Sequence, residues 1–260
     1  MQLVDIGANL THPAFHADLE EVLARAEVAG VSAMVVTGTS VAESTNALKA
    51  AKDHPQTLYA TAGVHPHHAR ECDESTIPAL RVLAQQPKVV AIGECGLDFN
   101  RNYSPHPDQE KWFRLQVELA IELKKPLFLH SRDAAEQFSA ILKSYVLPNA
   151  VAHCFTGEKA ELHAYLDLGL YIGITGWICD ERRGRHLVPL MPLIPAARLM
   201  IETDAPYLLP RSLKPRPADR RNEPAYLTEV AAAVAAARGG TACRKQLDRF
   251  TAARGFFGLP

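Results

Sequence analysis

The chain has 260 residues, of which 47% are hydrophobic and 22% are charged, and its formal net charge is −1. This composition is typical of a globular protein with a sizeable core. The near-neutral charge excludes a general attraction to nucleic acid or membranes, so any site for a polyanion must be a local patch.

The cysteines and the N-terminal residues indicate the expected cellular location of the protein. The five cysteines form no C-x-x-C pair and are odd in number, which predicts reduced thiols rather than a disulfide framework. The N-terminus lacks a basic region followed by a long apolar run, and no apolar stretch reaches the ~18–20 residues of a membrane span. We expect a cytoplasmic protein.

Short β-like runs alternate with amphipathic helical patterns along the whole chain. The predicted strands lie at 3–6, 33–36, 58–64, 89–92, 126–130, 150–153, 170–174 and 198–201. The predicted helices lie at 18–29, 41–52, 75–85, 108–124, 133–142, 158–168, 223–237 and 243–253.

Repeated β-then-α units of roughly 30 residues, without a linker, predict an α/β fold of the TIM (β/α)₈ barrel type. The barrel is expected to be a single domain over residues 1–260. A doubly wound open sheet is the rival fold. Its G-x-G-x-x-G turn is absent after the first predicted strand, where the sequence reads Gly7-Ala8-Asn9-Leu10.

Polar side chains recur where the predicted strands end, and in a barrel these positions converge on one mouth. They are Asp5, Asn9, His65, Glu94, His130, His153, Glu202 and Asp204. Carboxylate and imidazole together suit a divalent metal such as Mg²⁺, Mn²⁺ or Zn²⁺. Any one of these histidines taken alone is better explained by packing, and Glu94 alone by a loop cap. The recurrence at four strand ends favours a metal site.

Other chemistries have weaker support. There is no G-x-S-x-G elbow, so Ser131 is no convincing nucleophile, and there is no nucleotide-binding P-loop. Cys95 and Cys154 adjoin the proposed ligands and are interpreted as small buried groups, with soft metal ligation as the alternative.

Four motifs resemble the signatures of the TatD family of metal-dependent deoxyribonucleases, which are built on an amidohydrolase-type TIM barrel. They occupy 92–99, 130–134, 153–157 and 202–208, and a Gly-Val-His-Pro run at 63–66 also matches. The resemblance runs in order over essentially the whole chain. The stretches 172–177 and 179–183 are close to the TatD branch itself.

The resemblance implies that the metal ligands are Glu94, His130, His153 and Asp204. It implies that Asp204 also acts as general base, and that His65 contacts the scissile phosphate or a metal-activated water. Most members carry two histidine ligands after the first strand, where this chain has Gly7 and Asn9. Asn9 would then offer a weaker oxygen contact, which favours one tight metal or a second that arrives with substrate.

A basic, proline-rich loop follows the last predicted strand. Its cations are Arg211, Lys214, Arg216, Arg220 and Arg221. At the mouth of a barrel they could hold phosphates, together with Arg132, or the loop could be a stiffened, solvated connection. Trp177 would either stack on a base or cover the site.

The leading hypothesis is a metal-dependent exonuclease that trims single-stranded DNA in the 3′–5′ direction, with RNA as a further substrate and Mg²⁺ as the first choice of ion. The direction, and any role in DNA repair or degradation, come from the resemblance alone. A monomer is expected. The alternatives are a metal-dependent hydrolase of a small amide, ester or lactone on the same barrel, and a non-catalytic binding protein.

Overall fold

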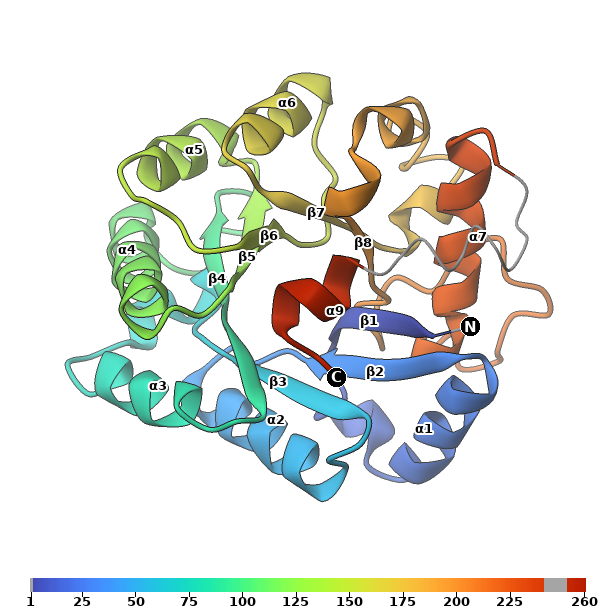
Figure 1. The fold of residues 1–260 in the computed structure, drawn as a ribbon, viewed down its shortest axis with the longest axis horizontal. Coiled ribbons are helices and arrows are strands. Elements are labelled where there is room, and N and C mark those ends of the chain that lie inside the picture. Colours follow the sequence, from blue (N-terminus) through green and yellow to red (C-terminus); the bar gives the residue numbers. More distant parts are fainter. Residues whose placement is uncertain (1, 241–251) are drawn as a thin grey trace. The chain divides into compact units, whose positions relative to one another are not determined.

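The computed structural model describes residues 2–240 and 252–260. The strands form one eight-stranded sheet in chain order, β1 to β8, and the pairs whose register is defined are parallel (Figure 1). The ends of β1 and β8 are joined by hydrogen bonds from Asp204 N–H to the Gly7 carbonyl (2.8 Å) and from Asn9 N–H to the Ala205 carbonyl (2.7 Å). A sequential parallel sheet whose first and last strands adjoin is that of a (β/α)₈ barrel, so the predicted fold class is confirmed.

The chain divides into two compact units. The central unit comprises Val36–His153 and Ala160–Tyr171, and the terminal unit comprises Met1–Val35, Cys154–Lys159 and Ile172–Pro260. The expectation of a single domain over residues 1–260 stays a prediction.

The central unit holds four neighbouring strands with helices packed against them. Its elements are α2 (Val41–Asp53), β3 (Leu58–Ala62), α3 (Thr76–Ala84), β4 (Val89–Asp98), α4 (His106–Leu123), β5 (Leu127–Arg132), α5 (Ala135–Lys143), β6 (Ala150–Ala152) and α6 (Lys159–Asp167). Strands β3, β4 and β6 are buried along their whole length and β5 over its first three residues, as expected for parallel strands covered on both faces. Aromatic rings link the helices: Phe113 of α4 stacks on Phe138 of α5 at 5.4 Å between centroids, and Phe138 contacts Tyr165 of α6 at 5.2 Å.

Strand β4 continues six residues past its predicted end. The register against β5 shifts between Ile92 and Cys95, and the strand then runs on to Asp98. The shift depends on Gly93 and Gly96, whose φ values are +138° and +146°. A Cβ at Gly93 would overlap the carbonyl oxygen of Phe128, and one at Gly96 would overlap that of His130. Glu94 was expected at the end of a strand, but it lies inside β4, at the irregularity where the register against β5 shifts.

Two buried glutamines connect α4 to the ends of β3 and β4. The side chain of Gln116 accepts from Val64 N–H (2.7 Å) and donates to the Val64 carbonyl (3.1 Å). The side chain of Gln109 accepts from Asp98 N–H (2.8 Å) and donates to the Asp98 carbonyl (3.1 Å). The side chains of these two helix residues thus supply hydrogen-bond partners to the backbone N–H and carbonyl groups of Val64 and Asp98.

The terminal unit is organised around β1 and β8. Its regular elements are β1 (Leu3–Ala8), α1 (Leu19–Val28), β2 (Val31–Val36), β7 (Tyr171–Ile174), β8 (Leu199–Ile201), α7 (Leu227–Ala237) and α9 (Ala252–Phe257). Asp5 of β1 is fully buried and accepts hydrogen bonds from Thr203 N–H (2.9 Å) and the Thr203 hydroxyl (2.5 Å). Burial raises the pKa of Asp5 to about 7, although the bonds from Thr203 oppose that rise.

The connection from β7 to β8 departs from the simple βα pattern. It is made of 3-10 turns at Gly176–Cys179, Val188–Leu193 and Ala196–Arg198 instead of an α-helix. Prolines at 189, 192 and 195 explain this, since each removes a backbone donor that an α-helix needs.

The remaining boundaries lie within a few residues of those predicted, but the helix expected at 243–253 falls mostly outside the described residues. The four cysteines that the structure describes form no disulfide with one another. None of the described helices combines the length and apolar character needed to span a bilayer.

Candidate metal centre

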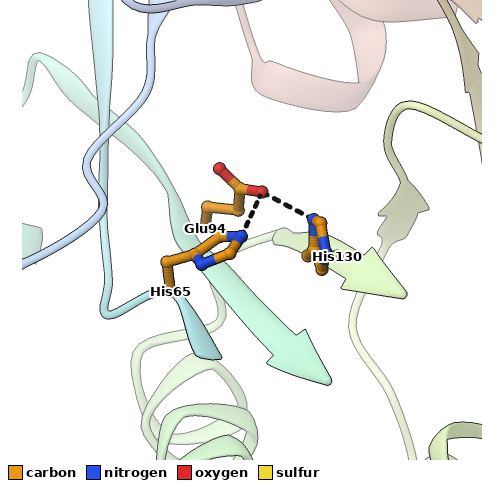
Figure 2. Close-up of side chains that lie close together, drawn as sticks. All are labelled: His65, Glu94 and His130. Carbon is orange, nitrogen blue, oxygen red and sulfur yellow. Dashed lines mark hydrogen bonds and ion pairs between the residues drawn. The ribbon is translucent and has the colours of Figure 1, made fainter. Parts of the chain in front are cut away.

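Four of the predicted site residues meet at one carboxylate oxygen in the central unit. Glu94 Oε1 lies 2.7 Å from His153 Nε2, 3.0 Å from His130 Nδ1 and 3.3 Å from His65 Nε2. Figure 2 shows the rings of His65 and His130 turned toward the same oxygen of Glu94. Side chains separated by up to 88 positions in the sequence are therefore brought within contact distance, as the strand-end pattern predicted.

The backbone of the central unit fixes these side chains. His130 lies on β5 opposite Gly96 of β4, and His153 N–H donates to the carbonyl of Leu129 (2.9 Å). His65 begins a 3-10 turn, Pro66–Glu71, and its Nδ1 accepts from His67 N–H at 3.1 Å. Since Nδ1 of His65 is an acceptor, a neutral His65 carries its proton on Nε2, which faces Glu94. His65 is thus arranged as a hydrogen-bond donor.

Burial and charge set the protonation of the cluster. Burial lowers the pKa of His65 to about 4, so this imidazole is neutral at pH 7. Burial alone would raise the pKa of Glu94, but His153 and His65 outweigh it and hold the Glu94 pKa well below its usual range. The cluster therefore presents an ionised carboxylate among imidazoles.

Two further residues belong to this cluster and were not singled out as site residues. Asp98 Oδ2 lies 2.7 Å from His67 Nε2 and 3.4 Å from His130 Nε2. Burial would raise the Asp98 pKa, but the contacts with these two histidines and a backbone N–H hold it below its usual range. The available signal was the HPHH run at 65–68 and the acid four residues past Glu94.

The donor set fits a divalent cation. Ligand atoms of His65, Glu94 and His130 lie within 4.8 Å of one another and are largely buried. Among the described residues, His130 Nε2 has no aligned hydrogen-bond partner although it is buried. A carboxylate with several imidazoles is a set that Zn²⁺ accepts readily, whereas Mg²⁺ and Mn²⁺ are more often bound by oxygen ligands.

Asp204 and Asn9 lie in the terminal unit and contact each other. Asn9 Nδ2 donates to Asp204 Oδ1 at 3.0 Å. Asp204 has a positive φ of 55°, in the left-handed region that Asp adopts more readily than most residues with a side chain. Close by in the chain, buried Glu202 accepts from Cys154 N–H at 2.5 Å. The terminal unit thus holds the Asp204 carboxylate in a defined position, with Asn9 as its donor.

Trp177 lines a pocket of about 260 Å³ in the terminal unit. The other lining residues are Gly176, Asp180, Arg183, Leu208, Leu209 and Arg211. The Arg183 guanidinium lies 4.7 Å from the centroid of the Trp177 ring, and Asp180 is within ion-pair distance of Arg183 (3.5 Å) and Arg211 (3.7 Å). Arg183 thus lies over the Trp177 ring, and Arg211 also donates to Glu181 (3.1 and 3.2 Å), so the predicted base contact of Trp177 stays a prediction.

The other predicted substrate contacts have different surroundings. Arg132 ends β5, opposite Asp98 in register. Arg221 is mostly buried and donates to Asp18 (2.6 and 2.8 Å) and Glu223 (2.7 Å). The guanidinium of Arg221 therefore bridges two acids of its own chain, and its predicted phosphate contact stays a prediction.

Comparison with known proteins identifies the family of the chain. The family model described as "TatD related DNase" matches residues 4–251. The chain belongs to the TatD-related DNase family. It is 56% identical over 239 residues (91% of this chain, 90% of the relative) to a protein of Klebsiella pneumoniae (strain 342) named 3'-5' ssDNA/RNA exonuclease TatD. A relative of the same name from Erwinia tasmaniensis is 53% identical and is covered over its full length, with 99% of this chain aligned.

Solved structures of the family share the fold. A TatD family hydrolase from Entamoeba histolytica matches with a TM-score of 0.91 at 27% identity, covering 100% of this chain and 99% of its own. The TatD homologue YJJV from Escherichia coli K12 matches with a TM-score of 0.90 at 27% identity, covering 99% and 98%. These matches confirm both the resemblance stated from the motifs and the barrel fold.

Proposed function

We propose that the protein is a metal-dependent exonuclease that hydrolyses phosphodiester bonds of single-stranded DNA or RNA from the 3′ end. The observation that carries this function is the convergence of three imidazoles on one oxygen of Glu94. The names of the relatives, exonucleases at 53–56% identity, favour it over hydrolysis of a small amide, ester or lactone. The substrate and the direction are taken from those relatives.

We propose that Glu94, His130 and His153 hold the divalent cation; Asp204 as a further ligand stays a prediction from the family resemblance. When bound, the cation polarises the phosphoryl oxygens and lowers the pKa of a coordinated water. Mg²⁺ is the first ion to test, as the family resemblance implies, and Mn²⁺ or Zn²⁺ the next, because carboxylate suits Mn²⁺ and imidazole suits Zn²⁺.

The protein's own groups supply the remaining chemistry. Asp204 accepts the proton of the attacking water, and Asn9 holds the Asp204 carboxylate by donating to Oδ1 (3.0 Å). His65 is neutral with its proton on Nε2, so it donates a hydrogen bond to a phosphate oxygen without adding a full charge.

Substrate contacts by Arg132 and Trp177 belong to the same proposal. Arg132 would meet a phosphate, and the Trp177 pocket would receive a base of the strand. Base stacking of this kind contributes about 1–3 kcal/mol and tolerates any sequence.

The test is mononucleotide release from 3′-labelled linear single-stranded DNA with Mg²⁺ or Mn²⁺. We expect activity in the native protein, none in Glu94→Ala, and native activity in Glu136→Ala, which alters an exposed glutamate of α5. Equal activity in the native protein and Glu94→Ala would refute the proposed site. Cleavage of circular single-stranded DNA as fast as linear would refute the exonuclease assignment.

A further inference from the structure

We propose that Tyr103 is a stacking platform for a nucleobase: its ring receives the base of one of the two nucleotides that the cleaved bond joins. This role rests on the proposed exonuclease function and adds to it a substrate contact outside the motifs of the family. All the residues involved lie in the central unit.

Tyr103 is an exposed aromatic residue beside the metal centre. It lies in the loop that joins β4 to α4, at the carboxyl end of β4, and 54% of its surface is exposed. In a parallel barrel, substrates bind at the carboxyl ends of the strands. The ring is therefore open to a ligand at the end of the strand that carries Glu94.

A row of aromatic rings leads from Tyr103 to the metal centre. The centroid of the Tyr103 ring lies 4.7 Å from that of His67, which in turn lies 4.2 Å from that of His65. Nε2 of His65 is 3.3 Å from Glu94 Oε1 (Figure 2). A single ring thus separates Tyr103 from His65, the proposed donor to a phosphate oxygen, so a base on Tyr103 would belong to a nucleotide next to that phosphate.

The contact with His67 leaves part of the Tyr103 ring available. The two ring planes make an angle of 78°, and an edge-to-face contact of this kind cannot cover both faces of the tyrosine. Phe99 and His106, the other aromatic pair of this loop, are stacked at 3.7 Å with 13° between their planes, so they already cover each other. Tyr103 therefore still has a face to offer to a base.

The backbone after Tyr103 is fixed, which lowers the entropic cost of ordering the ring when a ligand binds. The next residue, Ser104, is fully buried. Its hydroxyl accepts from Arg70 N–H (3.1 Å) and donates to the His67 carbonyl (2.9 Å). Its carbonyl accepts from the side chain of Gln109 (2.8 Å). The loop thus presents the tyrosine from a fixed position beside His67.

The competing explanation is that Tyr103 only shields His67, since single exposed apolar side chains are common on protein surfaces. Loss of a shield would weaken the binding of every strand to the same extent, whether or not a base is present. Loss of a stacking platform would weaken only the binding of strands that carry the base. A substrate from which one base is missing therefore separates the two explanations.

The experiment compares the native protein, Tyr103→Ala, Tyr103→Phe and a matched control, Tyr145→Ala. Tyr145 is a half-buried tyrosine between α5 and β6, at the opposite ends of the strands, and its hydroxyl donates to Glu118 (3.0 Å). The probes are fluorescent single-stranded oligothymidylates that are complete or lack the base of the last, the next-to-last or a central nucleotide. Affinity is measured by fluorescence anisotropy in EDTA, and nucleotide release is measured separately with Mn²⁺.

We expect the native protein to bind the complete strand about 5- to 100-fold more tightly than a strand that lacks one of its last two bases. Loss of the central base should change nothing. Tyr103→Ala should bind all the strands equally, whereas Tyr103→Phe and Tyr145→Ala should keep the native preference. A native protein without this preference, or a preference that survives in Tyr103→Ala, would overturn the inference.

Failure of the proposed function gives a different result. If the native protein shows the base preference and Tyr103→Ala loses it, but no nucleotide is released, the stacking role stands and the nuclease assignment fails. Nucleotide release without any base preference overturns the stacking role alone. Should Tyr103→Ala not fold, Tyr103→Leu decides in its place, because leucine keeps an apolar cover over His67 but has no flat aromatic face.

Discussion

Replacing Arg221 by Gln distinguishes a structural role for this residue from its predicted contact with substrate. The guanidinium donates four hydrogen bonds, to Asp18 (2.6 and 2.8 Å), Glu223 (2.7 Å) and the Ala14 carbonyl (2.5 Å), and it lies 5.0 Å from the centroid of the Phe15 ring. Glu223 has only 8% of its side chain exposed, so its charge is poorly hydrated if Arg221 is removed. Arg25 also bonds both acids and would remain as a partial substitute.

The expected cost of Arg221→Gln is therefore about 3 kcal/mol of unfolding free energy, which is below the sum of four separate hydrogen bonds. For a protein of this size that lowers the Tm by roughly 6–10 °C. Thermal unfolding followed by circular dichroism measures it, with Arg220→Gln, an exposed neighbour, as the control. We expect the control to melt like the native protein, and Arg221→Gln to keep the native KM for linear single-stranded DNA at 25 °C. An unchanged Tm together with a KM raised severalfold in Arg221→Gln would refute this reasoning and support the phosphate contact.

Three further predictions concern the metal ligand, a buried acid and a glycine. Glu94→Gln should weaken Mn²⁺ binding at least about 100-fold by calorimetry, because it removes the ligand charge; Glu136→Gln should bind as the native protein does, and near-native affinity in Glu94→Gln would exclude Glu94 as a ligand. The folded pKa of Asp5 is raised to about 7 from 3.8, so its protonated form stabilises the fold fully below pH 3.8 and this stabilisation is lost as pH rises through 7. The free energy of unfolding in urea should therefore fall by up to about 4 kcal/mol between pH 4 and pH 8 in the native protein, relative to Asp5→Asn. If the difference between the two proteins does not depend on pH, Asp5 is ionised throughout. Gly96→Ala should cost several kcal/mol or prevent folding, because its Cβ would overlap the His130 carbonyl, whereas Gly169→Ala, with φ +79° and nothing within 4 Å, should cost about 1 kcal/mol in chemical denaturation. Equal costs would mean that β4 relaxes around residue 96.

Local patterns were sufficient to predict the barrel and four residues of the cluster. His65, Glu94, His130 and His153 each follow an apolar run, and strands in chain order bring such positions together. Asp98 was not identified as a site residue, because the apolar run ends at Ile92 and the continuation of β4 depends on its register shift against β5. Only the folded chain specifies that shift.

The surroundings of Arg221 were unpredictable for a similar reason. Asp18 lies 203 positions away in the sequence, and nothing near Arg221 signals that an acid from the start of the chain will bind it. A basic loop is therefore expected to meet an external anion unless long-range contacts are known. The prolines at 189, 192 and 195, in contrast, already indicate that no α-helix joins β7 to β8.

The two glutamines of α4 make the metal centre depend on the helix behind it. Gln109 accepts from the N–H of Asp98, whose carboxylate contacts His67. Gln116 accepts from the N–H of Val64, which directly precedes His65 in the chain. These two amide hydrogens can exchange with solvent deuterium only when α4 separates from the strand ends. The protection of the Asp98 and Val64 amides against hydrogen exchange should therefore change together with that of the α4 amides. The lifetime of the assembled cluster is then limited by a single local event, the opening of α4.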